Sequence, residues 1–171
     1  MTKFTVAFAL AAFLPGTGVA CSLVTSPPFK IESAGRVTAA PPTLEVRKVN
    51  LVPSVGDVGD SCNGVGFISV EVALAGGSAR KLKHYGFLVR PISGVNGKNL
   101  FPDYPLALAP RILSKAPVIS WAWTGITPDS DGHVRWKFEV VPVSSTGVFG
   151  APVTVCAASD DSCDQPTGGR P

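Results

Sequence analysis

Few side chains in this sequence belong to the types that carry out catalysis. Its two histidines, His84 and His133, are the candidate general bases near neutral pH. We interpret His84 as an outward-facing strand residue and His133 as a solvated turn residue, rather than as members of a Ser–His–Asp site. The G-x-S-x-G motif of α/β-hydrolases is absent from the sequence. The sequence therefore predicts no catalytic residues and a protein that is not an enzyme, with a hydrolase of unrecognised site as an alternative.

The acidic residues offer little for glycoside hydrolysis or for metal binding. Glycoside hydrolysis needs two carboxyl groups about 5–9 Å apart, and most acids here fall in predicted turns or on outward strand positions. The segment 129–132 (DSDG) is similar to a fragment of a calcium loop, but the nearest glutamate, Glu139, lies inside a predicted strand. The cysteines have no C-x-x-C spacing. We predict a hairpin turn at 129–132, no metal site and no cofactor.

The tryptophans are the side chains best suited to bind a ligand by stacking. Exposed tryptophans can stack on sugar rings or anchor a protein partner. Trp121, Trp123 and Trp136 all fall on the apolar phase of alternating segments, so we expect them in the core. If they were exposed, Trp121 and Trp123 would be the ligand contacts of a carbohydrate-binding module, which is a second alternative function.

The first 20 residues have the pattern of a secretory signal peptide. Lys3 supplies a positive n-region, an uncharged apolar run covers 4–14, and small residues at 18–20 precede a cleavage site. The apolar run is shorter than the about 20 residues that a membrane-spanning helix needs. We predict that the chain is exported and that residues 1–20 are removed.

The four cysteines leave two alternatives open. Gly18-Val19-Ala20-Cys21 resembles the lipobox of bacterial lipoproteins, which implies lipidation of Cys21 and attachment to a membrane surface. Without lipidation, an oxidising compartment favours disulfides among Cys21, Cys62, Cys156 and Cys163. A Cys156–Cys163 bridge would close a short terminal loop, whereas a Cys62–Cys156 bridge would join two strands. We expect either an anchored lipoprotein or a periplasmic or secreted protein.

Charge and composition limit the partners. The chain has 15 basic and 12 acidic residues, a formal net charge of +3, which is too mild to indicate binding to nucleic acid. The local basic cluster at 80–84 is expected to be a solvated start of a strand. The expected partner is an envelope protein or a glycan, and contact with a membrane is expected only through a lipid on Cys21.

Between Thr43 and Cys156, apolar and polar side chains alternate with the period of half-buried strands. The apolar residues of 44–46 and 49–51 are out of phase by one position, which predicts a β-bulge or two short strands. Frequent turns and five to seven predicted strands favour an all-β antiparallel sandwich, with a barrel as the next choice. The expected organisation is a signal peptide at 1–20, an extended linker at 21–42, a sandwich at 43–156 and a flexible tail at 157–171.

The end of this domain resembles the last hairpin of fibronectin type III-like domains. An aromatic-alternating strand (136–144) is followed by a G-x-x-G turn (147–150), by Pro152 and by a valine-rich strand. The resemblance implies a fibronectin type III-like or immunoglobulin-like β-sandwich. Since the loops of such a scaffold carry most contacts, we expect a non-enzymatic binding or structural module of a bacterial cell envelope.

Overall fold

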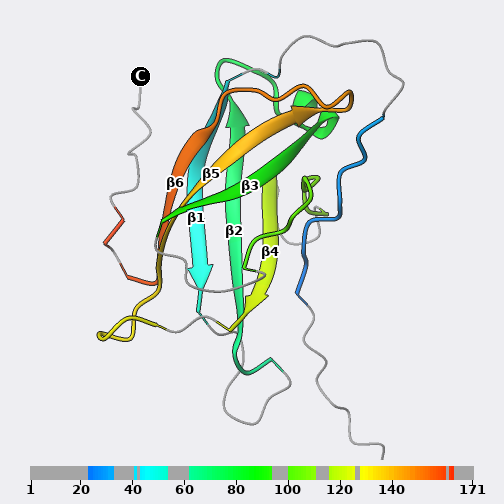
Figure 1. Ribbon diagram of the computed structural model, residues 1–171. Coiled ribbons are helices and arrows are strands. Elements are labelled where there is room, and N and C mark those ends of the chain that lie inside the picture. Colours follow the sequence, from blue (N-terminus) through cyan, green and yellow to red (C-terminus); the bar gives the residue numbers. More distant parts are fainter. Residues whose placement is uncertain are drawn as a thin grey trace, which may run out of the picture.

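The protein is a sandwich of two three-stranded antiparallel sheets (Figure 1). The predicted antiparallel β-sandwich is thereby confirmed. The computed structural model describes residues 23–32, 41, 43–53, 62–93, 100–110, 116–125, 128–160 and 162–163. The predicted signal peptide and Cys21 lie outside the described residues.

The first sheet has the strand order β1-β2-β4, with β1 at Leu44–Val52, β2 at Val65–Leu74 and β4 at Val118–Thr124. In β2, the even-numbered residues from Ile68 to Leu74 are buried, as the alternating sequence predicts. The odd-numbered residues between 67 and 71 are only partly buried and lie on the outer face.

The second sheet has the order β3-β5-β6, with β3 at Tyr85–Ser93, β5 at Arg135–Ser144 and β6 at Val153–Ala158. In β5, Trp136 and Phe138 are buried, while the alternate side chains of the first half of the strand point outward. Each of the two sheets therefore contributes one apolar face to a shared core.

A β-bulge resolves the phase switch that the sequence of β1 shows. Val46 pairs with Val72, but the next paired residue, Lys48, already faces Glu71, so one extra residue is accommodated in β1. The predicted bulge is confirmed. It keeps the apolar residues before and after it on the core side, and it places Lys48 and Asn50 together on the outer face.

The basic cluster at 80–84 forms a short 3-10 helix, Ala79–His84, so its prediction as the start of a strand was wrong. The Ser78 hydroxyl accepts a hydrogen bond from the Arg80 N–H and caps the helix. Leu82 is fully buried and anchors the helix to the core, while His84 lies exposed at its last position. Among the described residues, no helix has the length and hydropathy that a bilayer crossing requires.

Residues 23–32, here called the N-terminal strap, lie along one side of the sandwich (blue in Figure 1). The strap was expected to belong to an extended linker, and it is extended, but backbone hydrogen bonds hold it to the domain. Ser26 donates its N–H to the carbonyl of Ser120 in β4. Phe29 donates its N–H to the carbonyl of Pro105, which lies in the segment between β3 and β4, here called the crossover. Leu106 in turn exchanges two hydrogen bonds with Phe87 of β3, so the strap and the crossover cover two sheet edges.

The first prediction concerns Gly66, whose missing side chain leaves room for the ring of Trp123. Gly66 of β2 pairs with Trp123 of β4, and a Cβ atom at position 66 would lie 2.0 Å from a Trp123 ring carbon. Gly66→Ala should therefore lower the free energy of unfolding by about 1–3 kcal/mol through overpacking, measured by urea denaturation. The matched control is Ser69→Ala on the outer face of the same strand, which should leave stability nearly unchanged. Equal stability of the two variants would contradict this account.

Candidate functional site

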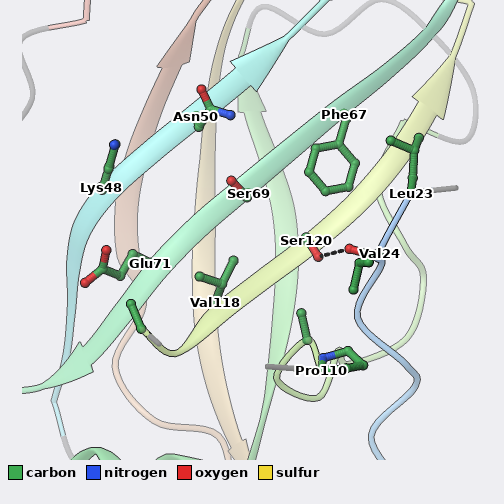
Figure 2. A pocket seen from close by; sticks show the side chains of 12 residues that line it. Leu23, Val24, Lys48, Asn50, Phe67, Ser69, Glu71, Pro110, Val118 and Ser120 are labelled. Atoms are coloured by element: carbon green, nitrogen blue, oxygen red, sulfur yellow. Dashed lines mark hydrogen bonds between the residues drawn. The ribbon is translucent and has the colours of Figure 1, made fainter. Parts of the chain in front are cut away.

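The best candidate site is a groove of about 500 Å³ on the outer face of the β1-β2-β4 sheet (Figure 2). This volume lies within the range of about 300–1,000 Å³ that is common for small-molecule sites. We call it the outer-face groove, and its lining residues are Leu23, Val24, Lys48, Asn50, Phe67, Ser69, Glu71, Ala109, Pro110, Ala116, Val118 and Ser120.

The floor of the groove consists of outward-facing residues that pair across three strands. Each cross-strand row has its own chemistry: one carries charge, the next carries amide and hydroxyl groups, and the third carries an aromatic ring. Successive rows lie two residues apart along the strands, a separation of about 6–7 Å. Written from β1 to β4, the first two rows are Lys48–Glu71–Val118 and Asn50–Ser69–Ser120. In the third row, Val52–Phe67–Ala122, Phe67 is the residue that lines the groove.

Two serines fix the wall that the N-terminal strap contributes beside β4. The Ser120 hydroxyl donates to the carbonyl of Val24 over 2.9 Å, and the Ser120 N–H donates to the Ser26 hydroxyl oxygen, also over 2.9 Å. Both serines are buried, with 2% and 5% of their surface exposed. The strap thus holds Leu23 and Val24 at the rim, and Ser120 supports the wall through its own hydroxyl group.

The segment between β3 and β4 also lines the groove, near the first residue of β4 (Figure 2). Ala109 donates its N–H to the carbonyl of Val118, the first residue of β4, over 2.8 Å. Pro110 and Ala116 then line the groove with apolar surface. The outer-face groove is therefore bounded by two segments that are distant in sequence from the strands of its floor.

The charges of the groove balance one another. Its lining contains one cation, Lys48, and one anion, Glu71, which are direct register partners on neighbouring strands. Lys48 is exposed and Glu71 is partly buried. Within the described part of the chain, the ion pair that forms is Arg135–Asp160, at the end of the other sheet. Lys48 and Glu71 can therefore both direct their hydrogen-bonding groups to a ligand.

The three tryptophans lie in the core, as the sequence predicts. Trp121 and Trp123 are each 4% exposed, and the Trp121 indole N–H donates to the carbonyl of Leu100 over 3.0 Å. The ring of Trp123 meets that of Trp136 edge-on, with centroids 4.9 Å apart. Neither Trp121 nor Trp123 lines the outer-face groove, so they make no contribution to binding there.

The turn at 129–132 is confirmed, but it joins strands of different sheets rather than the two strands of a hairpin. One carboxylate oxygen of Asp129 accepts the backbone N–H groups of Asp131 and His133 at 3.0 and 2.8 Å. The hydrogen bond from His133 holds the pKa of Asp129 below its usual value. The described residues contain no cluster of three His, Cys, Asp or Glu side chains that could hold a metal ion.

A charged cluster stabilises the end of the second sheet, away from the groove. The guanidinium group of Arg135 lies 2.8 Å from an Asp160 carboxylate oxygen. The Ser162 hydroxyl group and Arg135 together depress the pKa of Asp160 well below its usual range. Because the folded-state pKa is depressed, any stabilisation from Asp160 is present above the unfolded pKa and is lost as the pH falls. Arg135 is exposed and Asp160 is only partly buried, so solvent screens the pair and we expect this contribution to be small.

The disulfides narrow the alternatives for the cysteines. Cys156 is bonded to Cys163 across 5.6 Å between their Cα atoms, so the predicted local bridge is confirmed and the Cys62–Cys156 alternative is wrong. Cys62 also takes part in a disulfide. Cys21 lies outside the described residues, and its lipidation stays a prediction.

Sequence reasoning missed the residues of the groove, although the sequence carried two signals for them. Phe67 is an aromatic residue on the polar phase of β2, in line with Ser69 and Glu71. The bulge in β1 was predicted, but its effect on Lys48 and Asn50 depends on the register with β2. The groove could therefore not be recognised from the sequence without knowing the cross-strand register.

The hydrogen bond from Ser120 to Ser26 generates the second prediction. Ser26→Ala should leave the buried Ser120 N–H unpaired, and such a loss costs about 1–3 kcal/mol of unfolding free energy. The Ser120 amide should also exchange faster with solvent, measured by hydrogen exchange with NMR detection. The neighbouring exposed residue provides the control variant, Thr25→Ala. Unchanged protection of the Ser120 amide would show that the serine pair does not hold the wall.

Comparison with known proteins identifies no relative of this chain. The chain matches no protein-family model, no curated protein and no solved structure. The two packed sheets establish a β-sandwich without identifying a family.

Proposed function

We propose that this chain is a non-enzymatic, exported binding module of a bacterial cell envelope that holds its ligand in the outer-face groove. The observation that carries the proposal is the alignment of Lys48, Asn50, Phe67 and Glu71 on two paired strands, β1 and β2, in one hollow. Side chains mounted on a sheet are positioned more precisely than side chains on loops. The groove, rather than the loops expected from the sequence, is the proposed contact surface.

The chemistry of the groove supports binding rather than catalysis. Glu71 is the one carboxylate among the lining residues, whereas glycoside hydrolysis uses a pair. The lining contains neither histidine nor cysteine, and both histidines of the chain lie on other parts of the sandwich. The groove thus has hydrogen-bonding groups for holding a ligand, but its lining has neither a second carboxylate nor a histidine or cysteine.

The strand order supports a relationship to immunoglobulin-like and fibronectin type III-like sandwiches. In constant-type immunoglobulin domains, strands A, B, E and D form one sheet, and strands C, F and G form the other. The orders β1-β2-β4 and β3-β5-β6 correspond to A-B-E and C-F-G when the strands are matched along the chain. The irregular crossover that includes residues 100–110 then occupies the sequence position of strand D.

The disulfides support export and favour a released protein over a lipoprotein. Structural disulfides persist mainly in oxidising compartments, and both Cys62 and the Cys156–Cys163 pair are bonded. Of the four cysteines, Cys21 is the one left as an intramolecular partner for Cys62. We propose that these two form the second bridge. That bridge would use the thiol of Cys21, to which a lipid would otherwise be attached.

The mass of the mature protein is the third prediction. We expect a soluble species that begins at Cys21 and becomes heavier on reduction by two hydrogens for each of two disulfides. Intact-mass spectrometry of the soluble and membrane fractions measures this. Cys21→Ser should leave one disulfide and make the thiol of Cys62 reactive to alkylation. A membrane-bound species that carries a lipid mass on Cys21 would contradict the released form and establish the lipoprotein.

Retention on envelope material is the fourth prediction and tests the binding function. The wild-type protein should be retained by isolated bacterial envelope fractions, and Phe67→Ala should weaken retention about tenfold, equivalent to about 1.4 kcal/mol. The reason is that Phe67 supplies the largest apolar side chain of the groove floor. Lys137→Ala, on the exposed outer face of the other sheet, is the matched control and should bind like the wild type.

Two outcomes would contradict the proposed function. Equal retention of the wild type and Phe67→Ala would exclude the outer-face groove as the contact surface. A reproducible hydrolase activity that His84→Ala or His133→Ala abolishes would show that the protein is an enzyme.

A further inference from the structure

We propose that the ligand of the outer-face groove is a short, uncharged oligosaccharide. One sugar ring would lie against Phe67, and hydroxyl groups further along the chain would bind Asn50, Lys48 and Glu71. This inference rests on the proposed function, because it names the ligand class of the same groove. Three properties of the groove lead to it: its balance of charge, its mixture of donors and acceptors, and its length.

The balance of charge favours an uncharged ligand. Lys48 and Glu71 face each other across β1 and β2, so the two lining charges cancel. An anion near this row would be attracted by Lys48 and repelled by Glu71, and a cation would meet the reverse. An uncharged ligand with hydroxyl groups can use both, since the ammonium group donates and the carboxylate group accepts. Hydrogen bonds to charged groups are roughly twice as strong as those between neutral groups.

Donors and acceptors are intermixed over a small area of the floor. Asn50 presents two donors and an acceptor, and the hydroxyl group of Ser69 can act as either. These two side chains pair across β1 and β2 in the row next to the charged one. A hydroxyl group also donates and accepts, so successive hydroxyls of a sugar match this surface. An acyl chain would leave the same groups unpaired, at a cost for each group that it shields from water.

Phe67 gives the groove one apolar end. Its ring lies on the outer face of the central strand, and it is partly buried beside Leu23 of the strap. Figure 2 shows Phe67 and Leu23 at one end of the groove, with Glu71 and Lys48 toward the other. The C–H face of a sugar ring is apolar, while its hydroxyl-bearing rim is polar. The Phe67 ring can therefore pack against the C–H face, and the neighbouring polar rows can bind the hydroxyl groups.

The length of the floor favours an oligosaccharide over a single sugar. Phe67 and Glu71 are four residues apart on β2, which corresponds to about 13 Å along the strand. One sugar ring cannot contact both ends, so the aromatic and the charged rows would bind different rings of one chain. The walls formed by the strap and the crossover would keep that chain over the floor.

The test is a glycan array probed with the exported chain, its disulfides intact, followed by calorimetric titration of bound glycans. We expect neutral oligosaccharides to bind, with the trisaccharide or a longer form tighter than the monosaccharide. Phe67→Ala should weaken binding at least about tenfold and Asn50→Ala by about three- to tenfold. Binding should change little between low and high salt, because the groove has no net charge.

The controls separate loss of the ring from loss of folding. Phe67→Leu keeps an apolar side chain without a flat face, so it should stay folded by circular dichroism and still lose most of the affinity. Tyr104→Ala removes an exposed aromatic residue from a different hollow, and it should bind like the wild type. If Tyr104→Ala loses binding and Phe67→Ala keeps it, the groove is not the glycan site and the inference fails.

The remaining outcomes distinguish the ligand class from the binding function. Binding of acidic glycans alone, with steep dependence on salt, would overturn the uncharged ligand. A peptide array run with the same variants covers the other class of macromolecule. Peptide binding that depends on Phe67, without glycan binding, would show that the ligand is not a saccharide. The proposed binding function of the groove would then still hold. Absence of Phe67-dependent binding on both arrays and on envelope material would overturn both proposals.

Discussion

The structure depends above all on the packing of two sheets around an aromatic core. Trp121 of β4 meets Phe138 of β5 edge-on with 5.7 Å between ring centroids, and Phe101 of the crossover lies 5.9 Å from the first ring and 5.8 Å from the second. Aromatic pairs of this kind add about 0.5–1.5 kcal/mol beyond the burial of their surface. Alternate side chains of each strand point into this core. The side chains between them must therefore point outward, where strand pairing aligns them in rows. On the β1-β2-β4 sheet, those outward side chains form the floor of the groove.

Much of this architecture could be predicted from local sequence, because a two-residue period is a local property. The strands around Val70 and Phe138 and the bulge near Lys48 were all evident from alternation of apolar and polar residues. The 3-10 helix was missed, because Leu82 is the one buried residue in a run of charged neighbours and gives no period of its own. That Leu82 anchors the helix follows only from its burial in the folded core.

The groove could not be predicted, because its parts are distant in sequence. Ser26 and Ser120 are separated by 94 residues and still form the contact that fixes one wall. Nothing in the sequence around Ser26 shows that a segment with the composition of a linker will dock on β4. The order of the rows likewise depends on which residue of β1 faces Glu71, and the bulge shifts that register by one.

The position of the strap also bears on how the protein meets the cell envelope. Leu23 lines the groove and follows Cys21 by two residues, which span at most about 7 Å of extended chain. A lipid on Cys21 would therefore hold this end of the groove close to the bilayer surface, where headgroups would compete with an extended ligand for access. A bridge from Cys21 to Cys62 would instead tie the strap to the turn that precedes β2, the strand that carries Phe67, Ser69 and Glu71. A second disulfide at Cys21 would thus be compatible with a ligand entering at this end of the groove, whereas a lipid there would bring the same end to the membrane surface.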